Sequence, residues 1–336
     1  MNSEPSSASG EPSRPADAGK AADPGRERLL GGLYAFGAYL LWGFLPLYFL
    51  ALAPTGPFEI VAWRVILSLA FCALLLTVTR TWRKLIAILR NRRLVGWTIV
   101  AGALIYVNWQ TYLIGTLTGH VVEASLGYFI NPIVTVLLGV LVLRERLRIT
   151  QWIALAIATA AVLVIVVGYG AFPWIALTLA FSFGFYGLVK KQIGPSVDAI
   201  SGLTLESLWL TPVAVVQLVV IAVTSGGLSM GQGSPAHTVL LLLAGVVTAV
   251  PLLLFAAGAR RTPLTLMGML QFVAPILQFI IGVWLLGEPM SLERWIGFGL
   301  VWLALILLTV DSVVAARRSR TAPRTAAGVS DVAELT

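Results

Sequence analysis

The chain has 336 residues, of which 58% are hydrophobic and only 11% are charged. Its mean hydropathy is +0.90, a balance that excludes an ordinary soluble domain and indicates an integral membrane protein. The net charge of +8 does not indicate nucleic-acid binding, because the basic residues fall in short runs between apolar segments rather than on one soluble face.

The N-terminal stretch 1–28 is rich in Ser, Pro, Ala, Gly and charge. Such a composition cannot bury enough apolar surface to order itself, so this stretch is predicted to form a disordered cytoplasmic tail. A signal peptide is not expected, because the apolar run begins only after about thirty polar residues and is too long for one. Residues 317–336 are similar and are predicted to form a second disordered cytoplasmic tail.

Between these tails, ten apolar segments are each long enough for a helix that crosses the hydrocarbon core, which takes about 20 residues. They cover residues 31–52, 59–79, 95–117, 121–143, 149–167, 172–189, 200–222, 237–259, 262–286 and 292–315. A β-barrel would instead show alternating strands of about ten residues. The sequence therefore predicts an all-α integral membrane protein with ten transmembrane helices.

The Lys and Arg residues orient these helices, because basic residues accumulate in cytoplasmic loops. With the N-terminus in the cytoplasm, 21 of the 23 basic residues lie in cytoplasmic segments. The exceptions are Arg294, in a loop on the outer side, and Arg64, within the second span. The charge pattern predicts a multi-pass protein with both termini in the cytoplasm.

The stretch Tyr128–Trp152 returns later in the chain as Gln271–Trp295, and the two copies align from end to end without a gap. They are separated by five predicted spans, an odd number, so the second copy must cross the membrane in the opposite direction. Glu145 and its neighbouring arginines are expected in the cytoplasmic headgroup zone, and its copy Glu288 at the opposite face. Secondary transporters use such inverted repeats to alternate between inward-open and outward-open forms.

We therefore predict two inverted five-helix repeats around a central cavity. The first repeat covers residues 29–168 and the second covers residues 169–316.

Arg64 and Glu123 are ionisable residues inside predicted spans, where such side chains are costly and usually face a cavity or a partner. Arginine cannot lose its charge, so Arg64 needs an anion or a path to water. Glu59 is a poor partner for Arg64, because five positions along a helix leave it on a different face. We predict an ion pair between Arg64 and Glu123. The alternative is that Arg64 extends to the interface and Glu123 only caps a helix.

Several polar residues fall near the middle of predicted spans. Asn131 precedes Pro132 about 15 Å into its span, and it either satisfies backbone that the proline frees or offers an amide to substrate. Asn108 and Gln271 reach similar depths in other spans, and Gln271 superposes on Tyr128 in the repeat. Together these residues predict a polar lining within an aromatic cavity.

Aromatic side chains such as Tyr39, Trp42, Tyr112 and Tyr186 can stack on a flat or cationic ligand, although Trp and Tyr also anchor membrane interfaces. The predicted cavity residues are Trp42, Arg64, Asn108, Trp109, Glu123, Tyr128, Asn131, Tyr186 and Gln271. The prolines predicted to break helices are Pro132, Pro251 and Pro275.

Glu206 lies within the seventh predicted span and, with Glu123, is a candidate for proton coupling, because a charged carboxylate is costly there. A structural hydrogen bond is the alternative for Glu206. His120 and His237 are expected to be solvated or interfacial, and the single cysteine, Cys72, to be a packing residue. Because the predicted spans lack clustered His, Asp or Glu with metal or general-base spacing, we expect no metal, cofactor or enzymatic activity.

Eight segments of the chain together resemble the RarD family, one of the EamA-type families of the drug/metabolite transporter superfamily. They are "AYLLWGFLPLYF", "EIVAWR", "NWQTY", "EASLGYFINP", "QWIALAIA", "SFGFYGLVKK", "TAVPLLLF" and "GMLQFVAPILQF". The resemblance implies a ten-helix permease of the bacterial inner membrane with a central cavity. The positions that match the family are Trp42, Arg64, Asn108, Trp109, Glu123, Tyr128, Asn131, Pro132, Tyr186, Glu206, Pro251, Gln271 and Pro275.

The sequence thus predicts a secondary transporter that exports a small amphipathic metabolite or drug by alternating access. The chain lacks the nucleotide-binding motif GxxxxGK[ST], so a gradient or an exchanged solute must supply the energy. The expected partners are the lipid bilayer and a small-molecule substrate, with a homodimer left open and no nucleic acid. The alternatives are a membrane sensor or assembly protein without transport, and a membrane-embedded enzyme that modifies lipid-linked substrates.

Overall fold

A computed structural model describes residues 24–144, 147–169, 172–193, 196–259, 261 and 264–321, and within these residues every regular element is helical. Helix α1 (Pro24–Leu50) already includes residues 24–28, and α13 (Leu292–Thr321) includes residues 317–321. Both stretches belong to the predicted tails, whose remaining residues lie outside the described part of the chain. Glu145, predicted at the end of a span, also lies outside it.

Helices occupy all ten predicted apolar segments. Besides α1 and α13, they are α2 (Pro57–Val78), α4 (Arg92–Leu117), α5 (Val121–Leu143), α6 (Ile149–Tyr169), α7 (Trp174–Ile193), α8 (Ala199–Thr224), α9 (Pro235–Leu242), α10 (Ala244–Ala259), α11 (Leu264–Leu270), α12 (Val273–Ile280) and the π-helical turn η1 (Ile281–Leu285). By length and composition, seven of the described helical segments are candidates to cross a membrane. The expected number of ten crossings stays a prediction.

The extra helix α3 (Trp82–Leu89) lies in the basic stretch between α2 and α4. It buries Leu85 and Ile88, which share one face of the helix, while Arg83 and Lys84 are exposed. This amphipathic pattern stabilises a helix against the bundle rather than across a membrane.

The predicted helix breaks occur at one of the three prolines. Pro275 has no N–H to donate to the carbonyl one helical turn earlier, at Gln271, and residues 271 and 272 form the turn that separates α11 from α12. Helices α5 and α10 instead continue through Pro132 and Pro251, so the prediction of breaks there is wrong. The surrounding helical bonds are enough to carry each helix past its proline.

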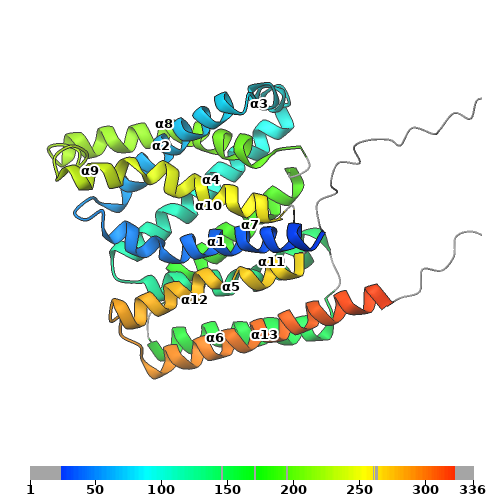
Figure 1. Cartoon of the computed structure of the whole chain (residues 1–336). Coiled ribbons are helices and arrows are strands. Elements are labelled where there is room, and N and C mark those ends of the chain that lie inside the picture. Colours follow the sequence, from blue (N-terminus) through cyan, green and yellow to red (C-terminus); the bar gives the residue numbers. More distant parts are fainter. Residues whose placement is uncertain are drawn as a thin grey trace, which may run out of the picture.

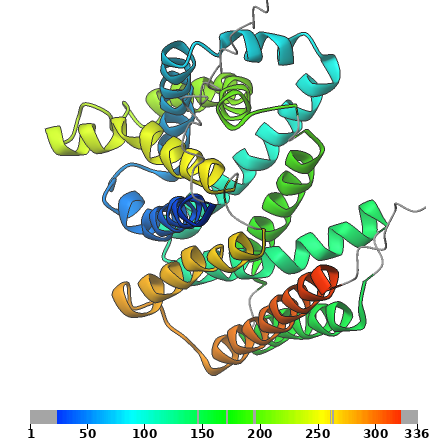
Figure 2. The same cartoon turned by 45° about the vertical axis from the view of Figure 1, so that its right-hand side comes forward.

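The helices form a bundle in which α6 packs along α13 at one edge and α2 packs along α8 at the other. The two edge pairs are separate in both views (Figures 1 and 2). Helix α2 leads to α3 and α8 leads to α9, and these lie on opposite sides of Figure 1, so α2 and α8 run in opposite directions. The start of α1 and the end of α13 lie on the same side.

The contacts between helices repeat in the two halves of the chain. Helix α4 packs on α7 and α8, and α10 packs in the same way on α1 and α2. Helix α5 packs on α7, and α12 packs on α1. Exchange of the two halves therefore preserves these helix contacts, as an internal repeat requires.

Two glycines show that this correspondence extends to single residues. A Cβ at Gly43 of α1 would lie 2.6 Å from the Leu277 side chain, and one at Gly184 of α7 would lie 2.9 Å from that of Val134. Val134 and Leu277 are equivalent positions in the two copies of the repeated stretch. Because the two glycines contact equivalent residues, they are themselves equivalent, and each allows the same helices to approach closely in its own half.

Helices α2 and α8 also correspond when they are aligned by their first residues, Pro57 and Ala199. All nine buried residues of α2 then fall on buried residues of α8. The alignment places Arg64 on Glu206, and each is the eighth residue of its helix. Two buried groups of opposite charge therefore occupy equivalent places in the two halves.

Candidate functional site

Arg64 is 5% exposed and projects from α2 toward α10 and the centre of the bundle. Its Nε donates a hydrogen bond to Thr248 Oγ1 at 2.7 Å. The guanidinium carbon lies 4.1 Å from the ring centroid of Trp109 and 5.5 Å from that of Phe49, distances typical of cation–π contacts. Aromatic faces and one hydroxyl thus accommodate a buried cation.

The predicted ion pair between Arg64 and Glu123 is wrong. One carboxylate oxygen of Glu123 accepts hydrogen bonds from the backbone N–H groups of Ile175 at 3.0 Å and Ala176 at 3.4 Å. These donors belong to the first turn of α7, where helical N–H groups have no partner within the helix and a negative charge is favoured. The alternative of a capping role therefore holds for Glu123, on a helix other than its own.

Glu288 is a second helix cap, which the sequence analysis did not identify. Its carboxylate is buried and accepts hydrogen bonds from the backbone N–H groups of Val121 at 2.6 Å and Val122 at 2.8 Å, at the start of α5. The sequence placed Glu288 at the end of a span and gave it no partner. Its occurrence in both copies of the repeat was the available signal.

Rings connect the Arg64 region to the other half of the molecule. Successive centroids are 5.2 to 6.2 Å apart, within the range of favourable aromatic pairs. The connected rings are Tyr48, Phe49, Tyr112, Tyr128, Phe183 and Tyr186. Of the predicted residues, Trp109 belongs to the buried core cluster around these rings, and Trp42, Tyr128 and Tyr186 pack against it.

Asn108 holds one of these rings in place. Its Nδ2 donates to the carbonyl oxygen of Leu179 at 3.2 Å and to Ser182 Oγ at 3.1 Å, and its Oδ1 accepts from the Tyr128 hydroxyl at 3.1 Å. Because Asn108 is buried and bonded on both sides of its amide, it orients Tyr128 and ties α4 to α7.

Asn131 behaves differently from Asn108. Its Oδ1 is buried and has no hydrogen-bond partner. The backbone group that Pro132 frees is a carbonyl, which only the Nδ2 of Asn131 could satisfy, and the carbonyl of Asn131 itself accepts from Thr135 Oγ1 at 2.9 Å. Both alternatives for Asn131, bonding to freed backbone and contact with a substrate, stay predictions.

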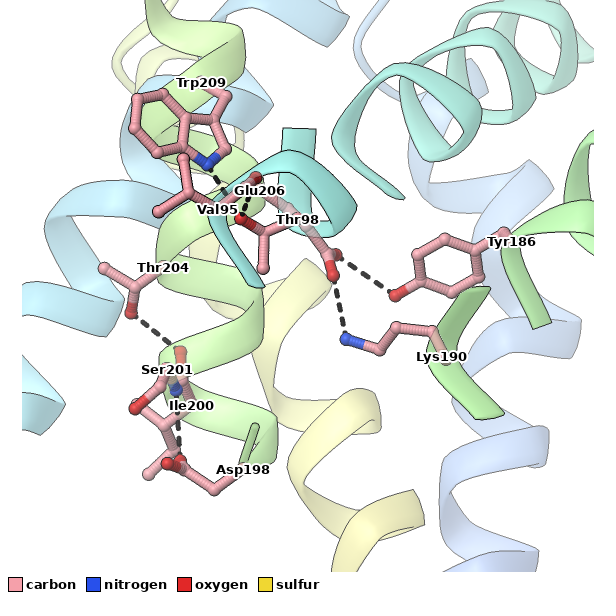
Figure 3. A network of polar contacts seen from close by, with 10 residues as sticks. All are labelled: Val95, Thr98, Tyr186, Lys190, Asp198, Ile200, Ser201, Thr204, Glu206 and Trp209. Atoms are coloured by element: carbon pink, nitrogen blue, oxygen red, sulfur yellow. Dashed lines mark hydrogen bonds and ion pairs between the residues drawn. The ribbon is translucent and has the colours of Figure 1, made fainter. Parts of the chain in front are cut away.

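Glu206 forms a compact charged network with α7, drawn in Figure 3. It is 1% exposed, and its carboxylate lies 2.8 Å from Lys190 Nζ and accepts a hydrogen bond from the Tyr186 hydroxyl at 3.1 Å. The Lys190 side chain is 30% exposed, and its Nζ lies 5.5 Å from the centroid of the Tyr186 ring. The structural role predicted as an alternative is therefore present, with Lys190 as a partner that the sequence placed in a loop.

Two further predicted residues are Trp42 and Gln271. Trp42 packs against Tyr39 and Phe255, with centroids 5.4 and 5.8 Å away, and its carbonyl accepts from Gln278. Gln271 lies in the turn between α11 and α12.

The two histidines have different surroundings. His120 is exposed, as expected. His237 is 8% exposed, and its Nε2 is within hydrogen-bond distance of Thr55 Oγ1 and the carbonyl oxygen of Leu52, so a solvated location is wrong for it. An interfacial location, near the start of α9, stays a prediction. Cys72 is buried and free, which confirms its packing role.

Two stretches of the chain, residues 29–167 and 173–310, match the model of the EamA-like transporter family. The chain belongs to this family. It is 45% identical to Protein RarD of Streptomyces exfoliatus, over 88% of this chain and 92% of that protein. It is 39% identical to Protein RarD of Escherichia coli K12, over 86% and 97%. A solved crystal structure matches the fold with a TM-score of 0.55 at 17% identity, covering 84% of this chain and 98% of that one.

The resemblance to RarD proteins is therefore confirmed. EamA-like proteins are transporters and not enzymes, and the membrane-spanning candidates make the chain a multi-pass membrane protein. The two matched stretches correspond to the two halves whose helix contacts repeat in the structure.

Proposed function

We propose that the chain is a secondary transporter that moves a small amphipathic metabolite or drug across the bacterial inner membrane by alternating access. The observation that carries this proposal is the exchangeable set of helix contacts in the two halves. A bundle built from two equivalent halves can open to one side or the other when the halves exchange conformations. The opposite directions of α2 and α8 in Figure 1 support an inverted repeat, to which we assign ten crossings.

The helix contacts at the two close-packed glycines are where we expect helices to separate and approach during this exchange of conformations. Gly43 lets α1 approach α12, and Gly184 lets α7 approach α5. Opening of the bundle on one side requires one of these pairs of helices to separate while the other stays in contact. The Glu206 pair with Lys190 joins α7 to α8 and would close one end of the path.

We propose export, with both termini in the cytoplasm. The relative from Pseudomonas aeruginosa named "Chloramphenicol-sensitive protein RarD", 32% identical over 84% of this chain, supports a drug or drug-like metabolite as the substrate. A gradient must drive accumulation, and each charge moved through 100 mV provides about 2.3 kcal/mol.

Metabolite profiling of a deletion strain, inside cells and in the medium, tests this proposal. Compounds that change are then measured for flux in liposomes that contain the purified protein. Export predicts that the substrate accumulates inside deleted cells and that flux depends on the protein. If no compound that changes in the deletion strain is moved by the protein in liposomes, a sensor or assembly role replaces transport.

A further inference from the structure

The positive charge of Arg64 is buried and is not neutralised by the described part of the protein. Among the described residues, no carboxylate lies within ion-pair distance of its guanidinium. Glu59, on the same helix, is engaged by the backbone N–H and hydroxyl of Ser229 at 2.8 and 2.9 Å, and Glu123 caps α7. A buried cation without an anion is costly, because arginine cannot shed its proton to become neutral.

The equivalent residue in the other half, Glu206, has the counter-ion that Arg64 lacks among the described residues. The alignment of α2 with α8 carries Arg64 onto Glu206, and the alignment of α1 with α7 that pairs their two close-contact glycines carries Phe49 onto Lys190. Glu206 meets Lys190 at 2.8 Å, whereas Arg64 meets the ring of Phe49. One half therefore supplies its own counter-ion, and the other half supplies an apolar face where the counter-ion would be.

The terminal nitrogens of the guanidinium have no hydrogen-bond partner among the described residues. Thr248 occupies Nε, while the terminal nitrogens of Arg64 are not among the buried polar atoms without partners in the described residues. They accordingly reach accessible space, which fits the 5% of the residue that remains exposed. Two terminal N–H groups of a guanidinium match the two oxygens of a carboxylate.

Next to this charge lies the chain of rings. Tyr112 and Tyr128 are 5.8 Å apart and extend from Phe49 toward Phe183. Rings of this kind pack against a flat apolar body, so a substrate that bears an anion for Arg64 gains most if it also carries such a body.

Resting on the proposed transport function, we infer that the substrate is an organic carboxylate with a flat apolar body, and that Arg64 binds its carboxylate. The substrate thereby acts as the counter-ion that Lys190 provides for Glu206 in the other half. Phe49 and Trp109 exclude water on one side of the guanidinium and strengthen its attraction for the incoming anion.

The test is equilibrium binding to the purified full-length protein in nanodiscs. The probes are phenylacetate, indole-3-acetate and hippurate, each compared with its primary amide, which keeps the ring and lacks the charge. Wild-type protein should bind the carboxylates about tenfold or more tightly than the amides, because a hydrogen bond to a charged group is stronger than one to a neutral group. Octanoate, a carboxylate without a ring, should bind more weakly than the aromatic acids.

The variant Arg64→Gln should remove the preference for carboxylates and leave amide binding nearly unchanged, and Arg64→Lys should restore part of it. Arg261→Gln is the matched control, because Arg261 is an exposed arginine paired with Glu27. Amide binding by Arg64→Gln shows that the variant is folded. Equal binding of acids and amides by wild type, binding of neither, or a carboxylate preference that survives in Arg64→Gln would each overturn the inference.

Failure of this inference and failure of the proposed function give different results. If neutral compounds are moved in liposomes but no carboxylate binds, transport stands and the substrate class is wrong. If carboxylates bind through Arg64 but no compound is moved, the binding site stands and transport is wrong.

Discussion

Arg64 and Glu206 occupy equivalent positions in the two halves, and their surroundings differ in one respect. Glu206 is neutralised within the protein by Lys190 and bonded to Tyr186. Arg64 contacts Thr248 and the rings of Phe49 and Trp109, and no carboxylate among the described residues pairs with it. The two halves therefore share the same helix arrangement but differ in charge. Glu206 is paired with Lys190, whereas Arg64 has no counter-ion among the described residues.

The physical cost of burial explains why this difference matters. A buried ion pair adds little net stability over apolar packing, but removal of one partner leaves an uncompensated charge. The Glu206 pair is therefore a contact whose two charges must stay together for as long as Glu206 is buried. A buried arginine without a carboxylate suits a ligand site, because an anionic ligand can form the ion pair that the described residues do not provide.

The largest expected effect comes from converting the Arg64 end into a copy of the Glu206 end. Arg64→Glu loses the cation–π contacts with Trp109 and Phe49, worth about 2 kcal/mol when desolvated, and the charged hydrogen bond to Thr248, worth about 1.5–3 kcal/mol, so it should lower stability by about 3–5 kcal/mol. Adding Phe49→Lys supplies the equivalent of Lys190, so the double variant should recover most of the stability but bind no carboxylate. Thermal unfolding and phenylacetate binding measure both effects. If the double variant is no more stable than Arg64→Glu, the two places are not equivalent.

Removal of the internal counter-ion should have the next largest effect. Lys190→Met leaves Glu206 buried and unpaired, and because the Lys190 side chain is 30% exposed, the expected loss is about 2–3 kcal/mol rather than the full value for a buried pair. Replacing both residues, as Lys190→Met with Glu206→Leu, should recover most of it.

The exposed pair of Arg261 with Glu27 provides the control for this change, because Arg261→Met should cost at most about 1 kcal/mol. Equal losses for the two pairs in chemical unfolding would mean that burial of Glu206 does not set its dependence on Lys190.

The two helix caps should differ in strength. Glu288→Ala removes both carboxylate oxygens from the start of α5, where they accept bonds of 2.6 and 2.8 Å, and should cost about 2 kcal/mol. Glu123→Ala removes a single oxygen that accepts bonds of 3.0 and 3.4 Å from α7, and should cost about 1 kcal/mol. Thermal unfolding of both variants tests the order, which a larger loss for Glu123→Ala would reverse.

A similarly small effect is expected for Tyr186→Phe, which keeps the ring and removes the hydroxyl that donates to Glu206 at 3.1 Å. Because Lys190 remains, the loss should be about 1 kcal/mol. A loss as large as that of Lys190→Met would assign the main stabilisation of Glu206 to the tyrosine rather than to the cation.

The helices and the repeat could be predicted from the sequence, because both leave direct signals in it. Apolar runs have the length of the hydrocarbon core, and the copies from Tyr128 and Gln271 align without a gap. The correspondence of α2 with α8 left no such signal, since Arg64 and Glu206 share no residue type. It became visible only in the pattern of buried positions.

The partners of the charged residues could not be predicted, because they depend on which helices become neighbours. Glu123 caps the start of α7, 52 residues away along the chain, and Glu288 caps the start of α5, 167 residues away. Lys190 follows a long apolar run, so the distribution of basic residues placed it in a cytoplasmic loop. The structure shows the last turn of α7 directing its amine to Glu206.

The most direct test of the account is the flux of radiolabelled hippurate in proteoliposomes, with the leak through protein-free liposomes subtracted. Wild-type protein, Arg64→Gln and Arg261→Gln are compared at equal amounts of folded protein. The account predicts that Arg64→Gln lowers protein-dependent flux about tenfold or more while Arg261→Gln matches wild type. Flux through Arg64→Gln equal to that of wild type would contradict the claim that the carboxylate of the substrate neutralises Arg64.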